Sequence, residues 1–395
     1  MKKRISFILL ILIVAIGAFF RLWMLMSVPP SPSLDEVSLG YNAYSILHTG
    51  RDEYGNFLPL LLRAYDDYRP ALYVYLVIPL IKLFGLNIFA IRLPSVILSL
   101  ITIVVSYFLV FELFSENAYK KIIALLTSFL LAISPWSIYI SRLGHEANLG
   151  LTCAVAAIYV FLFSINHPKK RWFLILAAFL FAISLDTYQS DKVFMPIMAI
   201  LLGVLFFKQL WKSKKILFIS IGFGTLVSLP FVFMSLNSQG LTRFDSTSAF
   251  SNIKPLYEQT SRKLLLDRQN HNVIGEIFDN RRMVIPTIFA KNFISHLDPF
   301  WLFSNGGKDS FKAPEVGLFY SWEFFFMLAG LFLYFKLPLK SKILIVGWIM
   351  AALIAPSITT QVPHAMRAMN ILPIPQIIIA LGIIGIIQFL TIKKW

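Results

Sequence analysis

The amino-acid sequence predicts an all-α polytopic membrane protein, and three observations support this fold class. Hydrophobic residues make up 57% of the 395 positions and charged residues only 14%, whereas about 25% of a soluble domain is charged. The mean hydropathy is +0.73. Apolar runs of about 20 residues, the length that crosses a bilayer, recur along the chain. We therefore expect one integral-membrane domain over residues 1–395.

About ten apolar runs are predicted to span the membrane. The first, Ile5 to Val28, follows Met1-Lys-Lys-Arg4; it is too long for a signal-peptide core and has no small-residue cleavage site, so we expect it to be retained. The others cover residues 92–114, 122–140, 147–165, 172–188, 193–210, 216–236, 317–335, 342–358 and 371–391. The run 71–85 is shorter and contains Pro79 and Lys82, so we expect a helix lying at the membrane interface.

The distribution of basic residues predicts the orientation. With 71–85 at the interface, seventeen basic residues fall on one side, and the short loops on the other side hold only three, Arg142, Lys192 and Arg367. The seventeen belong to the clusters at 2–4, 120–121, 169–171, 208–215, 336–342 and 393–394. This is the positive-inside pattern, and it would be lost if 71–85 crossed, because fourteen of the seventeen would move outside. The net charge of +16 therefore indicates topology and contact with anionic membrane lipids, not nucleic acid. We expect a multi-pass plasma-membrane protein with cytoplasmic termini.

Two long segments, 29–91 and 237–316, then lie on the outer side, where we expect any chemistry. In the first, Ser33 and Glu36 have the spacing of a capping box, followed by an amphipathic helix that Gly50 would end. Asp35 and Glu36 form an acidic pair directly after a span, which favours a functional role. The structural alternatives are the capping box for Glu36 and compensation of the helix dipole for Asp35.

Cationic and acidic side chains also gather in other outer segments. Arg69 precedes the interfacial helix and is suited to bind a lipid phosphate, although a Tyr/Arg membrane anchor is an alternative. Arg142, His145 and Glu146 lie within five residues of each other between two spans. His145 fits a general base, a metal ligand or a structural histidine.

A last outer loop joins the final two spans. His364 and Arg367 are three residues apart there and would share one face of a helical turn, where they are suited to hold a phosphate. The alternative is an amphipathic turn from which Arg367 reaches the membrane surface. The long loop 237–316 contains an amphipathic segment at 292–301 that we expect on the membrane, as a lid or an acceptor region.

Metal and cofactor signals are weak. The single cysteine, Cys153, lies inside an apolar run, which excludes an intramolecular disulfide framework and a cysteine-based zinc site. His145 and Glu146 are too few for a zinc site. Asp66 and Asp67 leave a divalent metal as an open alternative, and we expect no cofactor.

The outer residues, taken in order, resemble the C-type glycosyltransferase superfamily. The pattern consists of a span followed by Asp35-Glu36, Arg69-Pro70 before an aromatic helix, and Arg92-Leu-Pro-Ser95 after Gly85. Ser134-Pro-Trp136 with Ser141-Arg142, and Pro363-His-Ala-Met-Arg367, resemble the bacterial members. The most similar branch contains protein O-mannosyltransferases and the aminoarabinose transferases of lipid A. The resemblance covers residues 1 to about 210, and also the last two spans.

The resemblance implies sugar transfer from a polyprenyl-phosphate carrier to an acceptor on the outer side of the membrane. Asp35 would be the catalytic base. Arg69 occupies the place of a lysine associated with the donor phosphate, and Glu146 that of an acidic residue often found after the third span. Relatives of the aminoarabinose type carry an arginine where this chain has Ser38. The resemblance therefore implies that Arg142 or Arg367 supplies the missing charge.

The sequence thus favours an inverting glycosyltransferase that uses a polyprenyl-phosphate sugar as donor. Asp35 and Glu36 are the candidate catalytic residues. Arg69, Arg142, His145, Glu146, His364 and Arg367 are the candidate donor-binding or substrate-binding residues. The acceptor, whether a lipid, a glycan or a protein, is not indicated. Two other classes stay open: a transporter or flippase of a lipid-linked substrate, and a polysaccharide polymerase or ligase that uses a lipid diphosphate. A transporter favours ionisable residues at the midplane and inverted repeats.

Overall fold

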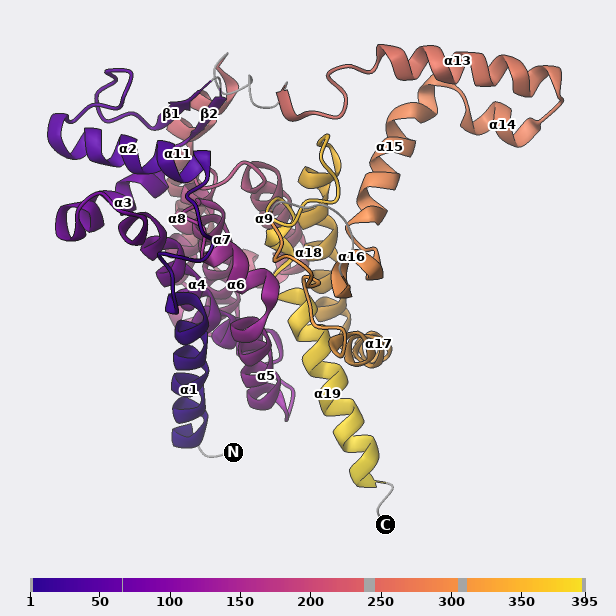
Figure 1. The fold of residues 1–395 in the computed structure, drawn as a ribbon. Helices are drawn as coiled ribbons and strands as arrows, with labels where there is room; N and C mark the ends of the chain where they lie inside the picture. The colour runs from indigo at the N-terminus through magenta and orange to yellow at the C-terminus, as the bar shows by residue number, and fades with distance from the viewer. Residues whose placement is uncertain (1–2, 66, 238–245, 305–310, 393–395) are drawn as a thin grey trace.

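A computed structural model describes residues 3–65, 67–237, 246–304 and 311–392 of the chain. The described part is almost entirely helical, with one two-stranded antiparallel hairpin. The start of α1 (Lys3–Leu22) and the end of α19 (Ile374–Ile392) lie at the same end of the molecule, at the bottom of Figure 1, and the first outer loop lies at the opposite end. The fold class expected from the sequence is confirmed.

Six described helices are long and apolar enough to cross a membrane. They are α1, α4 (Ile88–Leu113), α7 (Ala147–Asn166), α11 (Lys214–Leu236), α18 (Leu339–Ser357) and the segment of η2 (Met369–Ile371) with α19. The bent pair α5 (Lys120–Ile133) and α6 (Pro135–Ser141) makes a seventh if it is one span. The expected spans 172–188, 193–210 and 317–335 contain shorter helices, α8 (Phe173–Ser184), α9 (Asp191–Leu205) and α17 (Glu323–Tyr334). The total of ten spans stays a prediction.

The bend between α5 and α6 has a local cause in the sequence. The two helices meet at 55°, and the break lies at Ser134-Pro135. A residue before proline avoids the helical conformation, and Ser134 is extended, with φ −58° and ψ 124°. Proline also suits the first turn of the new helix, because its missing N–H has no partner there.

The first outer loop folds as two helices and a hairpin. The predicted capping box is confirmed: Ser33 caps α2 (Leu34–Thr49), Glu36 bonds back to the Ser33 backbone, and Gly50 ends the helix with φ 69°. The expected interfacial helix is α3 (Leu72–Phe84), at 13 residues too short for a full crossing. Strands β1 (Leu61–Ala64) and β2 (Asp67–Pro70) precede it and were not expected from the sequence.

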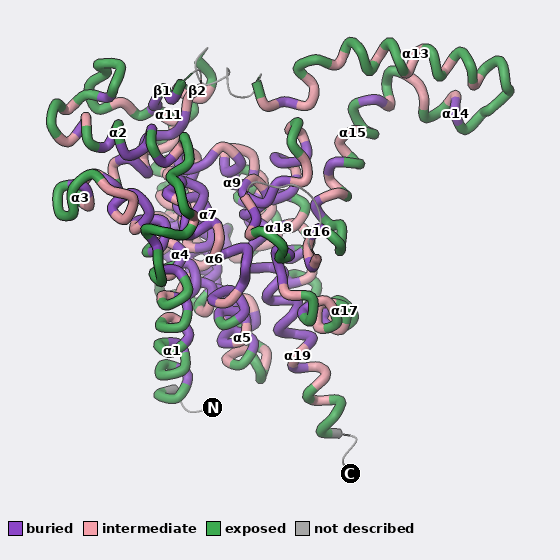
Figure 2. Tube along the Cα trace, in the orientation of Figure 1, coloured by how far each residue is buried: buried purple, intermediate pink, exposed green. Residues whose placement is uncertain are grey.

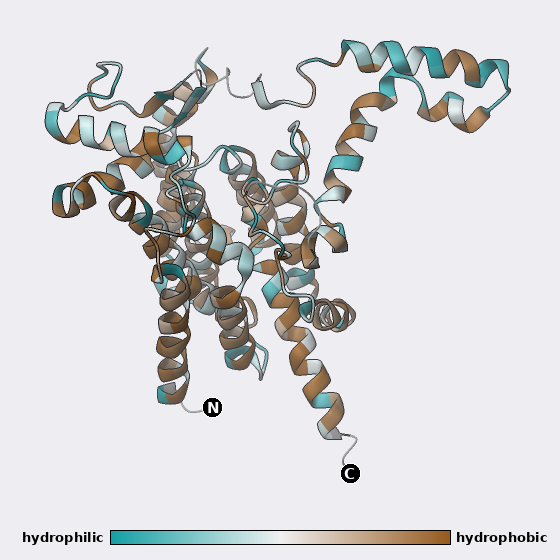
Figure 3. Cartoon of the chain, viewed as in Figure 1, coloured by the Kyte–Doolittle hydropathy of each residue, from teal (hydrophilic) through white to brown (hydrophobic). Residues whose placement is uncertain are grey.

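Buried side chains form one large apolar core among the spans and a smaller one beneath α2 and α3. Figure 2 shows this interior in purple, whereas much of α1 is exposed. Figure 3 shows the spans as mostly hydrophobic. Arg21 fastens α1 to its neighbours, because its guanidinium donates to Ser99 Oγ at 2.9 Å, to Ser137 Oγ at 2.8 Å and to the Ala132 carbonyl at 2.8 Å.

The chain between α7 and α19 contains six further helical elements among its described residues. They are η1 (Pro168–Lys170), α10 (Phe207–Trp211), α13 (Lys254–Gln269), α14 (Val273–Phe278), α15 (Arg281–Ser295) and α16 (Pro299–Phe303). The expected amphipathic segment 292–301 thus divides between α15 and α16. Lys2, Lys393 and Lys394 of the basic clusters lie outside the described residues.

Candidate active site

Glu36, in the first turn of α2, is buried and fully engaged, with only 1% of its surface exposed. Its Oε1 accepts from Arg92 Nε at 2.7 Å and from the Gly144 backbone N–H at 2.9 Å. Its Oε2 accepts from the Ser33 N–H at 2.8 Å. Burial favours the neutral acid, but the bonds from Arg92, Gly144 and Ser33 outweigh it and lower the pKa of Glu36. Glu36 therefore joins three distant segments of the chain as an anion.

Asp35 differs from its neighbour, because its side chain is 37% exposed. Its Oδ1 lies 2.5 Å from Nη2 of Arg69, and its Oδ2 lies 3.8 Å from Nε2 of His145. The two carboxylates thus leave the same helical turn in different directions. Asp35 is the one that solvent and a substrate can reach.

Arg69 is held by the β1–β2 hairpin. It pairs across the hairpin with Leu62, and its side chain is buried, whereas Arg63 on the neighbouring strand is exposed. Among the described residues, its Nε and Nη1 groups have no hydrogen-bond acceptor. Burial disfavours the cation, but Glu146 and Asp35 outweigh it and raise the pKa of Arg69. A buried cation with two such N–H groups is suited to receive an anion.

His145 and Glu146 lie beside this pair, at the N-terminus of α7. His145 Nδ1 accepts from the Ala147 N–H at 3.2 Å, so a neutral ring carries its proton on Nε2, which faces Asp35. Oε2 of Glu146 lies 3.3 Å from His145 Nδ1. The Tyr188 ring contacts the imidazole edge-on, with centroids 5.7 Å apart. The structure therefore brings four of the expected residues together: Asp35, Arg69, His145 and Glu146.

Arg142 is not placed in this group. Its guanidinium donates to backbone carbonyls in the last turn of α1 and in the segment that follows it, including those of Phe20 at 2.7 Å and Val28 at 2.9 Å. Further bonds reach the carbonyls of Arg21 and Met24. The arginine thus satisfies the open C-terminal carbonyls of a span, an arrangement that differs from the phosphate contact expected of it.

His364 lies in a second, neighbouring group. Its ring stacks on Phe311 with centroids 5.0 Å apart, and its backbone N–H donates to His296 Nε2 at 3.3 Å. His296 Nδ1 in turn bonds the Asn292 carbonyl at 2.7 Å. Burial lowers the pKa of His296 to about 4 and that of His364 to about 3, with Arg367 contributing to both shifts. His145 also lowers the pKa of His364, so the two groups are within electrostatic range.

Asp191, at the start of α9, joins the segment next to Tyr188 to the segment that follows His364, and it was not predicted as a site residue from the sequence. Its Oδ2 accepts from Thr187 Oγ1 at 2.6 Å and from Ser184 Oγ at 3.4 Å. Its Oδ1 accepts from Asn370 in the loop that carries His364. Burial raises the pKa of Asp191 to about 7. Arg92 was not predicted as a site residue either, although an arginine in an apolar run itself indicates a buried partner.

An apolar groove of about 490 Å³ lies among α7, α8, α9 and α11. Small residues such as Ala178, Gly203 and Gly224 keep it open. Leu185, at its lining, directly precedes the segment that carries Tyr188 to His145. One lining residue of the groove thus lies three positions along the chain from Tyr188, whose ring contacts His145.

Among the described residues, no group of three or more His, Cys, Asp or Glu side chains is arranged so that it could hold a metal ion. Asp66 lies outside the described residues, and Asp67 lies on β2, where its charge contributes to the raised pKa of Arg69.

Known proteins resemble this chain in part of its sequence and in its fold. Residues 68–233 match the family model described as dolichyl-phosphate-mannose-protein mannosyltransferase. The apo oligosaccharyltransferase from Archaeoglobus fulgidus is similar over 100% of this chain and 52% of its own, with 15% identity and a TM-score of 0.61. ArnT from Cupriavidus metallidurans, bound to undecaprenyl phosphate, is similar over 97% of this chain and 60% of its own, with 13% identity and a TM-score of 0.55.

A third structure is the same archaeal oligosaccharyltransferase in complex with an inhibitory peptide and a dolichol-phosphate. Its sequence identity to this chain is 14% and its TM-score is 0.61, and the match covers 100% of this chain and 51% of the oligosaccharyltransferase. The chain thus spans about half the length of these structures. No curated protein sequence matches it. The resemblance to the C-type glycosyltransferase superfamily is confirmed, and the chain has the fold of that superfamily.

Proposed function

We propose that the chain is a membrane-embedded glycosyltransferase that moves a sugar from a polyprenyl-phosphate donor to an acceptor on the outer face. The observation that carries this proposal is the Asp35–Arg69 pair. An accessible carboxylate lies 2.5 Å from a buried cation whose Nε and Nη1 have no acceptor among the described residues. This pair supplies a base and an anion site in one place.

The reaction is a single displacement at the anomeric carbon. The acceptor hydroxyl oxygen forms the new C–O bond and gives its proton to Asp35. The C–O bond to the donor phosphate breaks, and the polyprenyl phosphate leaves with the electron pair. One displacement inverts the anomeric configuration, and it needs one carboxylate, since the phosphate leaves without protonation. Arg69 stabilises the charge that grows on the leaving phosphate.

Glu36 has no place in this chemistry, because Arg92, Gly144 and Ser33 occupy its oxygens. We assign His145 and Glu146 to orienting Asp35 and Arg69, which lie within their reach. We assign His364 and Arg367, in the last outer loop, to the sugar or the acceptor, because His364 lies within electrostatic range of His145.

The groove supports a donor with a long apolar tail. A polyisoprenoid needs an apolar channel, and the groove lined by Gly203 and Gly224 has a mainly apolar lining. Two structures of this fold are complexes with undecaprenyl phosphate and with a dolichol-phosphate, which supports a lipid monophosphate as carrier.

The test is sugar transfer by the purified protein in lipid, with polyprenyl-monophosphate and polyprenyl-diphosphate sugars compared. We expect turnover with a monophosphate donor, inverted product and loss of activity in Asp35→Asn. The matched control is Glu116→Gln, the same carboxylate-to-amide change at an exposed inner-loop residue, which should keep full activity. Full activity in folded Asp35→Asn would refute the assignment of the base. Turnover with diphosphates alone would favour the polymerase or ligase class, and vectorial transport without sugar release would favour the flippase.

A further inference from the structure

Helices α13 and α14 form an arm that projects sideways from the bundle, as the upper right of Figure 1 shows. We call residues 254–278, which contain both helices, the outer arm. A tight turn closes the arm: Asn272 Nδ2 donates to Asp267 Oδ1 at 2.9 Å, and the Asn272 N–H bonds the Asp267 carbonyl at 2.9 Å. Helix α15 connects the arm to the bundle through contacts with α18.

Helix α14 packs on α13 with one side only. A Cβ on Gly275 would meet the Asp267 carboxylate at 2.3 Å, and Glu276 lies 4.0 Å from Arg268 of α13. At about 100° per residue, the four apolar side chains of α14 cover an arc of about 140° opposite Gly275 and Glu276. These four remain largely exposed: Val273 68%, Ile274 71%, Ile277 55% and Phe278 57%.

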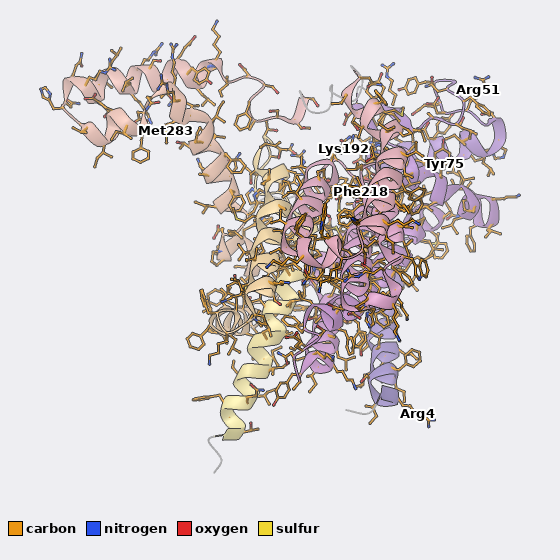
Figure 4. The ribbon with its side chains drawn as sticks, turned by 180° about the vertical axis from the view of Figure 1, so that it is seen from behind. Arg4, Arg51, Tyr75, Lys192, Phe218 and Met283 are labelled. Carbon is orange, nitrogen blue, oxygen red and sulfur yellow. The ribbon has the colours of Figure 1, made fainter. Side chains whose placement is uncertain are left out.

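The apolar arc lies on the side of the outer arm that faces the membrane-spanning helices. Figure 1 and the view from behind in Figure 4 both show α14 beneath α13, on the side of the spans. In Figure 4, Met283 marks the base of the arm, and Arg4 marks the far end of the bundle. Because α13 covers the upper side of α14, the arc faces the side of the arm on which the spans lie.

Basic residues outnumber acidic residues in the outer arm and the four residues after it. Residues 254–282 hold six basic and four acidic side chains. Glu276 and Asp279 lie 4.0 Å from Arg268 and Lys263 within the arm. Arg281 and Arg282, both exposed, lie three and four residues after Phe278. Apolar side chains flanked by arginines are typical of helices that lie in the bilayer interface and contact anionic headgroups.

We propose that the outer arm docks on the outer leaflet, with Val273, Ile274, Ile277 and Phe278 inserted among the lipids and Arg281 and Arg282 at the anionic headgroup phosphates. The bilayer then fixes the outer end of α15. The other end of α15 is fixed by Asn292 Nδ2, which donates to the Ser357 carbonyl at 3.0 Å, and by the contact of His296 with the His364 N–H at 3.3 Å. The arm thus couples the lipid surface to the loop that carries His364.

Site-directed spin labelling tests this proposal in the full chain. The single cysteine is removed by Cys153→Ala, and a nitroxide is attached through Ile274→Cys or, as matched control, Gln269→Cys, which by helical phase lies on the side of α13 away from α14. In nanodiscs of phosphatidylethanolamine and phosphatidylglycerol, we expect the Ile274 label to collide more with oxygen than with a water-soluble nickel chelate. The Gln269 label should show the reverse.

Two outcomes would overturn membrane docking. Equal exposure of both labels to nickel would show that the arm lies in water. Exclusion of both oxygen and nickel from the Ile274 label would show that protein covers this position. The charge contribution has its own readout. Replacing phosphatidylglycerol by phosphatidylcholine, or introducing Arg281→Gln with Arg282→Gln, should reduce the insertion depth; an unchanged depth would overturn the headgroup contact.

Discussion

The adjacent carboxylates Asp35 and Glu36 should separate stability from activity. The buried Glu36–Arg92 pair has Nε and Oε1 2.7 Å apart, and two backbone N–H groups also bond Glu36. Removing one member of such a pair leaves a buried charge without compensation, which costs about 3–5 kcal/mol. We therefore expect Glu36→Gln to lower the free energy of unfolding by about 3 kcal/mol or more, while the folded fraction keeps its turnover number.

Asp35→Asn should behave in the opposite way. Its partner Arg69 retains Glu146 and Asp67 as neighbouring charges, and the side chain is partly exposed, so solvent screening keeps the stability change to about 1 kcal/mol. Loss of a general base lowers turnover by about 10²–10⁴-fold. The two variants are compared by denaturant unfolding in mixed micelles and by single-turnover sugar transfer.

A double-mutant cycle isolates the buried pair. Combining Glu36→Gln with Arg92→Met should cost less than the sum of the single changes, with a coupling energy of about 1–3 kcal/mol. Additive effects would show that the pair does not act as a unit. A stable but inactive Glu36→Gln, together with an active Asp35→Asn, would reverse the roles given to the two residues.

Further predictions concern the phosphate site, pH and the groove. Arg69→Lys should raise the KM for the donor about tenfold, which corresponds to about 1.4 kcal/mol of binding free energy, because lysine loses the planar two-donor contact with the phosphate. The control Arg63→Lys, on the paired strand, should leave the KM unchanged. Equal KM values in the two variants would refute the role of Arg69 in binding the phosphate. Since burial lowers the pKa of His296 to about 4, only the unfolded state takes up its proton between pH 6.5 and 4, so stability should fall as pH decreases through this window. His296→Phe should reduce the dependence of the unfolding free energy on pH in this window. It should not abolish this dependence, because burial lowers the pKa of His364 to about 3 as well. An unchanged pH dependence would contradict a buried, neutral His296. Gly203 lines the groove, and a Cβ there meets nothing within 4 Å, so Gly203→Phe should fill the groove and raise the KM for long-chain donors while short-chain donors are unaffected. Equal effects on both would argue against a lipid tail in the groove.

The sequence predicts local features of this protein well. Ser33, Glu36 and Gly50 specify where α2 begins and ends, because capping depends on residues close together in the chain. The short helix before Gly85 was predicted on similarly local grounds. The break at Ser134-Pro135 also has a local cause, but it was not predicted, since 122–140 was expected to be one span. Asp35, Arg69, His145 and Glu146 were each identified from polarity in apolar surroundings, and the structure places them together.

Long-range partners could not be predicted in this way. Nothing near Arg142 in the sequence indicates that the carbonyls ending α1 lie beside it, so its charge suggested a ligand instead of a helix end. The partner of Glu36, Arg92, lies 56 residues away. The outer arm was not predicted from the sequence for another reason. Helix α14 has only six residues, which is too few to show a clear helical period in the apolar residues.

The bond between Asp191 and Asn370 has a consequence for how the protein is made. The two residues are 179 positions apart, and at about 5–20 residues per second a ribosome needs roughly 9–36 s to go from one to the other. During that interval the N-terminal half is already inserted, and a carboxyl group destined for the protein interior lacks its amide partner. Synthesis therefore passes through a partly folded intermediate, and the lifetime of this intermediate depends on how soon the last helices are made and inserted. Slowing translation between these codons would lengthen the exposure of that intermediate to membrane proteases.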